Sequence, residues 1–179
     1  MNFTPAARRA VLIAVALTLA GLAVKAEAAT CDETCSVIKT MLIARSNSFK
    51  NYRGGLIDDE AGEWFSTLSV PGALDSKGAA GPCEINNGTD IKHTVWRCRL
   101  GKASGPNWAA SLDPILKQIR AAVPAGWTEG PLLKNMKTFS APGDDMGAVA
   151  VSYFENRDQT RTITLSVFVT DGLRKSRGN

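Results

Sequence analysis

The segment Arg161-Thr-Ile-Thr-Leu-Ser-Val-Phe-Val-Thr170 decides the fold class, because hydrophobic and polar residues alternate along it. Such alternation sends successive side chains to opposite faces of a β-strand. The inward residues are hydrophobic and the outward ones are polar: Ile163, Leu165, Val167 and Val169 against Thr162, Thr164, Ser166 and Thr170. We therefore predict a strand at 161–170 with one face on a hydrophobic core.

A turn, two strands and a helix are predicted upstream of this segment. Asn156-Arg157-Asp158 favours a turn that joins a strand at 147–155 to the last one, and another strand is predicted at 135–141. A helix at 107–122 has an apolar face at helical spacing, made by Trp108, Leu112, Ile115, Leu116 and Ile119. Because proline suits the first position of a helix, the alternative is a start with Asp113 as the cap and Pro114 after it.

The N-terminal half shows a similar order of elements. The spacing of Cys35, Ile38, Leu42 and Phe49 predicts a helix from Thr30 to about Asn51, which Arg53-Gly54-Gly55 would end. Alternating residues predict a strand from Glu63 to Val70 that stops at Pro71-Gly72. A loop at 73–82 and two strands, at 83–86 and 92–100, complete this half.

A shift of 71 positions lays the first half of the chain on the second. It superimposes five identical residues: Gly55 on Gly126, Thr67 on Thr138, Ser69 on Ser140, Pro71 on Pro142 and Gly72 on Gly143. We predict a duplicated α-β-β-β unit with halves at 30–101 and 102–171. One unit is small for a core, so the pair should form an α+β fold with two helices packed on one face of a mainly antiparallel sheet.

The first 28 residues are predicted to be a cleaved signal peptide. Arg8 and Arg9 precede an uncharged apolar run from Ala10 to Val24, and Ala26-Glu27-Ala28 offers small residues at a cleavage site. The run is shorter than the roughly 20 residues that span a bilayer. We expect a periplasmic or secreted protein after cleavage near Ala28, exported by the general or the twin-arginine route, with one domain at 29–171.

The charge of the chain narrows the class of partner. The full chain has 21 basic and 17 acidic residues, a net charge of +4, and removal of residues 1–28 leaves +2. Export and this near balance argue against nucleic acid as a partner. The predicted flexible tail at 172–179 carries Arg174, Lys175 and Arg177, which would support at most peripheral contact with an anionic membrane.

Four cysteines in an exported chain indicate two disulfides. They are Cys31, Cys35, Cys83 and Cys98. A four-thiolate zinc site needs two close pairs, and the second pair is too widely spaced, so we predict no metal.

The pairing of the cysteines stays open between two arrangements. Thr30 and Glu33 form a capping box that would place Cys31 in the first turn of a helix, a poor geometry for a bond to Cys35, and this favours bridges from helix to strand. A turn at Asn86-Asn87-Gly88 would separate Cys83 from Cys98 by about 20 Å at 3.3 Å per residue. A turn centred on Asp90-Ile91 would instead bring those two face to face.

Few residues suggest catalysis. Asp58, Asp59, Glu60 and Glu63 form the densest acidic cluster, in a predicted loop, and His93 is the only histidine. Carboxylates can hydrolyse glycosidic bonds, alone or with His93, so a small periplasmic hydrolase is the alternative function. The serine of a nucleophile elbow and glycine-rich phosphate loops are both missing from the sequence, and we predict no catalytic residues and no cofactor.

The favoured function is binding without catalysis. The tryptophans can fill a core or line a groove, and the strand with Trp96 carries His93, Arg97 and Arg99 on its other face. We predict a disulfide-stabilised protein that binds a protein partner or a small ligand in the cell envelope. The predicted surface comprises Trp64, Asp58, Asp59, His93, Arg97 and Arg99.

Overall fold

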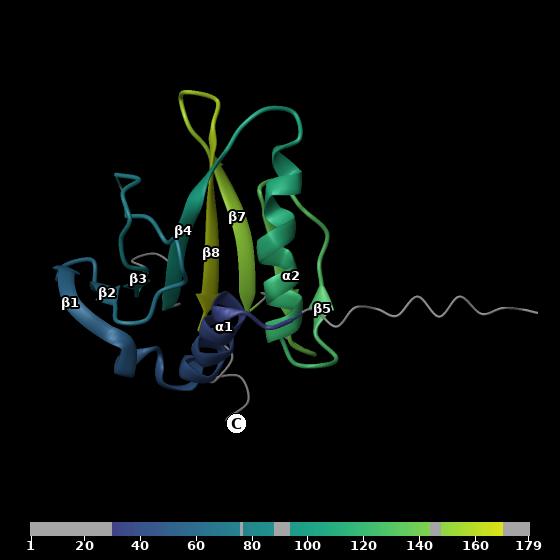
Figure 1. The fold of residues 1–179 in the computed structure, drawn as a ribbon. Helices are drawn as coiled ribbons and strands as arrows, with labels where there is room; N and C mark the ends of the chain where they lie inside the picture. Colours follow the sequence, from purple (N-terminus) through teal and green to yellow (C-terminus); the bar gives the residue numbers. More distant parts are fainter. Residues whose placement is uncertain (1–29, 76, 88–93, 144–147, 170–179) are drawn as a thin grey trace, which may run out of the picture.

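The computed structural model describes residues 30–75, 77–87, 94–143 and 148–169. Within them the chain forms two α-helices and one antiparallel sheet of eight strands (Figure 1), so the α+β class is confirmed. The strand order is β1-β2-β3-β4-β8-β7-β6-β5. His93, the signal peptide and the basic tail lie outside the described residues.

The two halves contribute four strands each. The first half consists of α1 (Glu33–Ala44), β1 (Arg53–Asp58), β2 (Glu63–Ser66), β3 (Glu84–Asn86) and β4 (Val95–Ala103). The second consists of α2 (Asp113–Ala122), β5 (Thr128–Glu129), β6 (Met136–Ser140), β7 (Val149–Glu155) and β8 (Arg161–Phe168). Short 3-10 turns η1 (Arg45–Asn47), η2 (Lys50–Tyr52) and η3 (Trp108–Leu112) flank the helices. The halves meet where β4 pairs with β8.

The prediction of three strands in each half is therefore wrong, since each half has four. The missed strands are the two sheet edges, β1 and β5. Arg53-Gly54-Gly55 was expected to end a helix, but η2 ends at Tyr52 and β1 begins at the next residue. Two glycines gave β1 no alternating pattern, and β5 has only two residues. That the unit is duplicated, and that both helices pack on one face, remain predictions.

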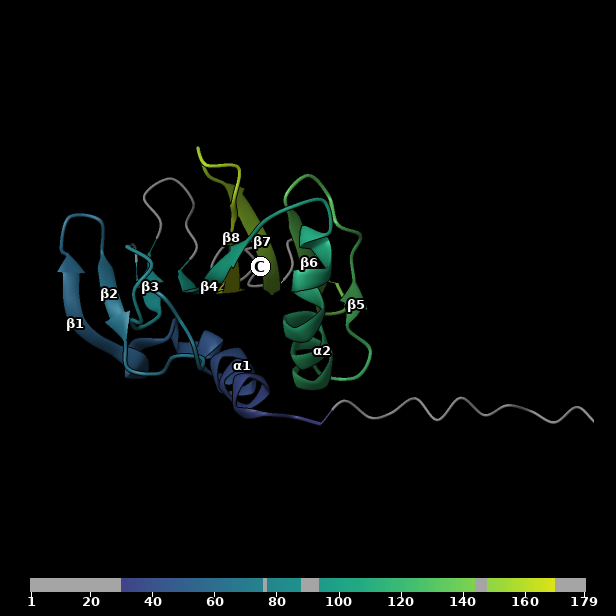
Figure 2. The same cartoon turned by 45° about the horizontal axis from the view of Figure 1, so that its top comes forward.

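Buried residues from the strands and from both helices belong to a single hydrophobic core. Trp96 and Cys98 of β4 and Leu165 and Val167 of β8 are fully buried. They belong to the same cluster as Ile38, Met41 and Ile119 from the helices. The two helices contact each other, and α1 also contacts β8 (Figure 2). The inward residues predicted for the last strand are thus confirmed as core.

Both helices start differently from the expectation. The N-cap of α1 is Asp32, whose carboxylate accepts a hydrogen bond from the backbone N–H of Cys35 at 3.0 Å, in place of Thr30. The N-cap of α2 is Leu112, and Pro114 lies in the first turn as expected, but Asp113 is a helical residue without a capping bond. Among the described residues, neither helix is long and apolar enough to cross a membrane.

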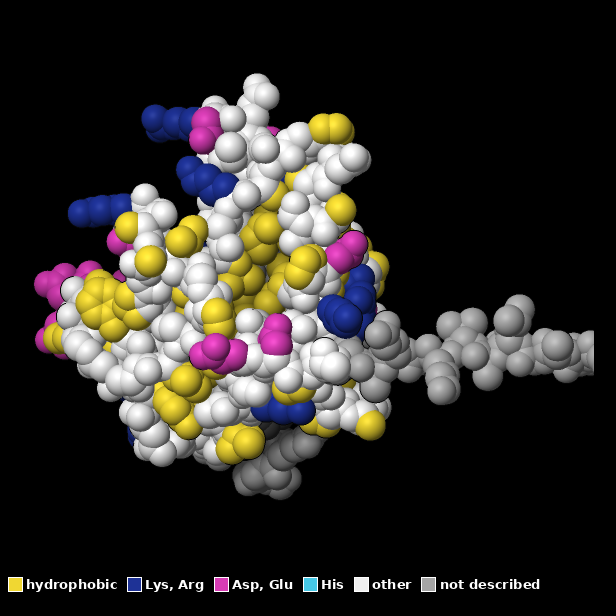
Figure 3. Space-filling view, in the orientation of Figure 1, with side chains coloured by type: hydrophobic (Ala, Val, Ile, Leu, Met, Phe, Trp, Pro, Cys, Tyr) yellow, Lys and Arg dark blue, Asp and Glu magenta, His cyan; other side chains and the backbone are white. Residues whose placement is uncertain are grey.

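The surface seen from the side of the helices is mixed. Figure 3 shows hydrophobic side chains on the floor of a depression beside α2, and further hydrophobic side chains near the β1 edge. Leu56 and Ile57 of β1 are 52% and 40% exposed. Acidic and basic side chains are scattered around these areas, and no single charge dominates this view.

The cysteines form two disulfides, Cys31–Cys35 and Cys83–Cys98. Bridges from helix to strand, the favoured arrangement, are therefore wrong. Cys31 precedes the N-cap Asp32, whose backbone is extended, so Cys31 is outside the helix and its sulfur can turn back to Cys35. Glu84 pairs with Arg97 in the β3–β4 ladder, which sets Cys83 opposite Cys98. That is the pairing expected for a turn centred on Asp90-Ile91.

Candidate functional site

The strand residues that point away from the core line a hollow of about 620 Å³. Its centre is made by β4, β8 and β7, through Arg97, Arg99, Thr162, Thr164, Ser166 and Ser152. We call these six residues the open face. Phe154 and Phe168 also line the hollow, where Phe154 pairs with Thr162 and Phe168 with Val95 at opposite ends of β8. Of the outward residues predicted for the last strand, Thr162, Thr164 and Ser166 thus form the floor of the hollow, and Thr170 lies outside the described residues.

The register of the strands explains why the surface is hollow here. Ser166 of β8 lies between Arg97 on β4 and Ala150 on β7. The next row places Thr164 between Arg99 and Ser152. In these two rows the side chains on β8 and β7 are small, whereas those on β4 are long, so β4 forms a wall beside a low floor. A volume of this size falls within the range of about 300–1,000 Å³ found for small-molecule sites.

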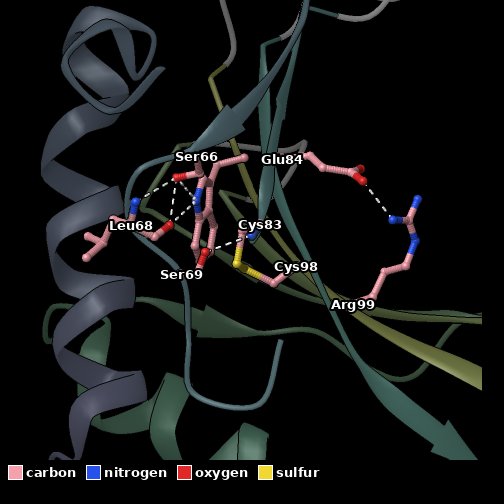
Figure 4. The surroundings of a disulfide bond; sticks show 8 residues. Ser66, Leu68, Ser69, Cys83, Glu84, Cys98 and Arg99 are labelled. Carbon is pink, nitrogen blue, oxygen red and sulfur yellow. Dashed lines mark hydrogen bonds and ion pairs between the residues drawn. A yellow bond between two sulfur atoms is a disulfide. The ribbon is translucent and has the colours of Figure 1, made fainter. Parts of the chain in front are cut away.

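A shared carboxylate fixes the two arginines of this wall. Glu84 on β3 accepts a hydrogen bond from Nη1 of Arg99 at 2.7 Å and one from Nη2 of Arg97 at 3.4 Å. Figure 4 shows the Glu84–Arg99 pair extending from strands that the Cys83–Cys98 disulfide joins. Cys83 is next to Glu84 in the sequence, and Cys98 lies between Arg97 and Arg99. Their disulfide therefore links the strands that position both guanidinium groups.

The same disulfide is packed on a hydrogen-bonded layer. The indole N–H of Trp96 donates to the Ser66 hydroxyl at 3.0 Å and to the Leu68 carbonyl at 3.2 Å. The backbone N–H of Cys83 donates to the Ser69 hydroxyl at 2.7 Å (Figure 4). These bonds satisfy polar groups beneath β3 and β4. They therefore stabilise the strands that position the two arginines.

The far end of the hollow combines amides with an aromatic ring. The side-chain amide of Asn156 donates to the hydroxyls of Thr160 and Thr162, at 2.9 and 3.0 Å. These bonds fix the hairpin between β7 and β8. Phe154, opposite Thr162 in the ladder, is 70% exposed. A large exposed ring beside a hollow offers apolar contact to a ligand.

The predicted acidic residues lie apart from the hollow. Asp58 ends β1, and its carboxylate accepts a hydrogen bond from the backbone N–H of Ala61 at 3.0 Å, so it stabilises the turn to β2. Asp59 is exposed in that turn. Glu63 faces Asp58 across the ladder and accepts a hydrogen bond from Asn86. The structure thus brings Asp58 and Glu63 together, at the end of a hairpin.

The remaining predicted residues divide between core and surface. Trp64 is partly buried against the core, and the Arg53 guanidinium lies 4.0 Å from the centre of its ring. Of the five predicted surface residues that the structure describes, Arg97 and Arg99 line the hollow, and His93 lies outside the described residues. Trp96 is core, and the ring centres of Trp108 and Tyr153 lie 4.1 Å apart with the rings tilted by 55°. The part of the chain that the structure describes holds no group of side chains suited to a metal ion.

The strongest electrostatic perturbation lies away from the hollow. Arg120 of α2 donates two hydrogen bonds to Glu129 of β5, and Lys137 of β6 lies 2.7 Å from the same carboxylate. The hydrogen bond from Arg120 is the main reason that the pKa of Glu129 falls to about 2, and Lys137 lowers it further. This cluster joins α2 to the β5 edge.

The sequence pointed to only part of this site. Arg97 and Arg99 were found because they share a face of their strand, and the outward residues of β8 were visible as alternating threonines and serines. Ser152 and Phe154 were missed, because β7 pattern alone does not tell which side faces the core. Comparisons with protein-family models, curated proteins and solved structures give no match.

Proposed function

We propose that this is an exported binding protein whose ligand occupies the hollow over the open face. The main support for the proposal is the hollow itself, which has a volume of about 620 Å³ and lies on strands β4, β8 and β7. Two internal disulfides are compatible with an exported, disulfide-stabilised protein. We place the protein in the cell envelope or outside the cell, with residues 1–28 removed.

The distribution of polar groups supports binding over hydrolysis. A hydrolase of the kind considered above would need Asp58, Asp59 or Glu63 beside a bound substrate. None of these carboxylates lines the hollow, and Asp58 and Glu63 already accept hydrogen bonds within the fold. The hollow itself offers arginine, serine, threonine and asparagine side chains, which can orient a ligand.

We also propose that the two halves arose by duplication of one helix–sheet unit, with both helices on one face. The support is the sheet order, in which β1 to β4 and β5 to β8 run inward from opposite edges and meet at β4 and β8. In this proposal the hollow lies at the junction of the halves, since β4 and β8 form its centre. A binding site at such a junction would be absent from a single unit.

The binding site is tested with a substitution that places a large side chain in the hollow. Ser152→Phe introduces a ring where Ser152 faces Thr164, and Ser111→Phe adds the same ring at an exposed position that does not line the hollow. The full chain is produced with its N-terminal segment, recovered from the cell envelope and measured by native mass spectrometry. The intact mass also reports whether residues 1–28 have been removed.

We expect the wild-type protein and Ser111→Phe to retain an additional bound mass that Ser152→Phe lacks. Circular dichroism should give the same spectrum for all three proteins. Equal retention by Ser152→Phe would place binding elsewhere on the molecule, and no retained ligand on the wild type would contradict the proposal for this hollow. An uncleaved chain that stays in the cytoplasm would overturn the export proposal.

A further inference from the structure

We propose that the hollow binds a small organic anion, with its oxyanion group at Arg97 and Arg99 and an apolar body extending to Phe154. This inference rests on the proposed function, because it names the class of ligand that the same hollow takes. It depends on three features of the hollow: the sign of the charges that line it, the donors that remain on the arginines, and the position of the exposed ring.

Among the described residues that line the hollow, the charged side chains are all positive. They are Arg97 and Arg99, and none of the described lining residues is a carboxylate. Glu84 bonds to both arginines, but it carries one negative charge against two positive ones, and its side chain is only 18% exposed. One positive charge therefore remains uncompensated within this group, facing a surface of neutral hydroxyls and amides.

The guanidinium groups keep donors for a ligand. A guanidinium has five N–H donors, and Glu84 receives one bond from each arginine. The side chains of Arg97 and Arg99 are 38% and 27% exposed, so N–H donors that Glu84 does not use remain accessible from the hollow. Arginine forks suit carboxylate, phosphate and sulfonate oxygens.

The register sets the size of the apolar body. Phe154 lies on β7, two strands from β4, and its partner Thr162 is two residues from Thr164, which pairs with Arg99. With strands 4.8 Å apart and 3.3 Å per residue, the Cα atoms of Arg99 and Phe154 are about 12 Å apart. Two or three aromatic rings would bridge this span, resting on the threonine and serine floor. Phe154, at 70% exposure, gains most from such contact.

A matched pair of fluorescent probes tests the inference. 1-Anilinonaphthalene-8-sulfonate carries an oxyanion on an aromatic body, and N-phenyl-1-naphthylamine has the same rings without the charge. Both are titrated into the folded, oxidised protein at low salt. The variants are Arg97→Gln and Arg99→Gln, with Lys39→Gln on the exposed surface of α1 as the control for loss of a positive charge.

We expect one saturable sulfonate site per chain, and about tenfold weaker binding in each arginine variant, because a hydrogen bond to a charged group is lost. Binding of the neutral probe should change less than twofold, and Lys39→Gln should bind both probes like the wild type. Arg99→Lys should recover part of the sulfonate affinity, and Phe154→Ala should weaken both probes.

The outcomes separate this inference from the proposed function. If Ser152→Phe abolishes binding of both probes while Arg97→Gln and Arg99→Gln weaken both equally or not at all, the hollow binds ligands but the anion assignment is wrong. If Ser152→Phe changes neither probe, the hollow is not a binding site and both proposals fail. Competition by 1-naphthoate and by 1-naphthyl phosphate then shows whether carboxylate or phosphate is the preferred oxyanion.

Discussion

The two sides of the central strands have opposite chemistry although their residues alternate along the same chain. On β4, Trp96 and Cys98 are fully buried, whereas Arg97 and Arg99 line the hollow. On β8, Leu165 and Val167 are core, whereas Thr164 and Ser166 form the floor. The core side stabilises the fold by burial of apolar area, and the open side adds little of that kind. Substitutions on the open side should therefore change binding with little loss of stability.

The largest effect is expected on the core side. Trp96→Ala removes the largest fully buried side chain together with the indole hydrogen bonds to Ser66 and the Leu68 carbonyl, which keep only the hydrogen bonds between Ser66 and Leu68. We expect a loss of about 3–5 kcal/mol in the free energy of unfolding, measured by urea denaturation. A loss below about 1 kcal/mol would mean that this side of β4 is not the core that supports the arginine wall.

The disulfides should rank next, and unequally. Cys83 and Cys98 are 15 residues apart and lie at the strands of the arginine wall, whereas Cys31 and Cys35 are four apart. The loss in the free energy of unfolding grows with the length of the closed loop. Replacing Cys83 and Cys98 by alanine should therefore cost about 3 kcal/mol, and replacing Cys31 and Cys35 about 2 kcal/mol. Equal amounts of oxidised protein are compared by urea denaturation. A larger loss for the Cys31–Cys35 pair would contradict this ranking.

A smaller effect should come from the ion pairs that join α2 to the sheet edge. The pKa of Glu129 is lowered to about 2 in the folded protein, mainly by its hydrogen bond with Arg120, from an ordinary value of 4.5. Its stabilisation is therefore complete above pH 4.5 and is lost as the pH falls towards 2. Because Arg120 is half-exposed, we expect about 1 kcal/mol or less.

The control for this prediction is Glu129→Gln. Denaturation curves of the wild type and of Glu129→Gln between pH 6 and pH 2 should converge as the pH falls. Parallel curves at all pH values would show that the Glu129 carboxylate contributes nothing through its charge. Since Arg120, Glu129 and Lys137 do not line the hollow, binding of the sulfonate probe at neutral pH should be the same in the wild type and in Glu129→Gln.

The smallest change in stability is expected on the open side. Thr164→Ala shortens one residue of the floor, next to Leu165 of the core. We expect the free energy of unfolding to change by about 0.5 kcal/mol or less, in contrast to Trp96→Ala. If Thr164→Ala destabilised the protein as strongly as a core substitution, Thr164 would be a structural residue, and the contrast between the two sides would fail.

Alternation along the chain was enough to predict that β8 has a core side and a polar side. It was not enough to predict which strands pair with each other. The periodicity of 161–170 identified both its core side and its polar side. The polar stretch 86–91 allowed two turns, so the position of Arg97 relative to Glu84 could not be predicted from spacing alone. The observed β3–β4 register fixes both that ion pair and the Cys83–Cys98 bond.

The sheet edges and the walls of the hollow were beyond sequence patterns for a different reason. β1 contains Gly54-Gly55 and its residues are mostly exposed, so it has no hydrophobic face to reveal it. The hollow arises from the small side chains of Ser152, Thr164 and Ser166 on the β7–β8 hairpin beside the long ones of Arg97 and Arg99 on β4, a strand far from that hairpin in the sequence. Such a contrast becomes visible only once the order of the strands is known.

Backbone amide NMR of the oxidised protein, titrated with 1-anilinonaphthalene-8-sulfonate, tests the central claim most directly. We predict saturable shifts confined to residues that line the hollow, above all Arg97, Arg99, Ser152 and Thr164, with α1 and α2 unchanged. Shifts centred on α2 and the depression beside it, or the absence of saturable shifts on β4, β7 and β8, would contradict the assignment of the open face as the binding surface.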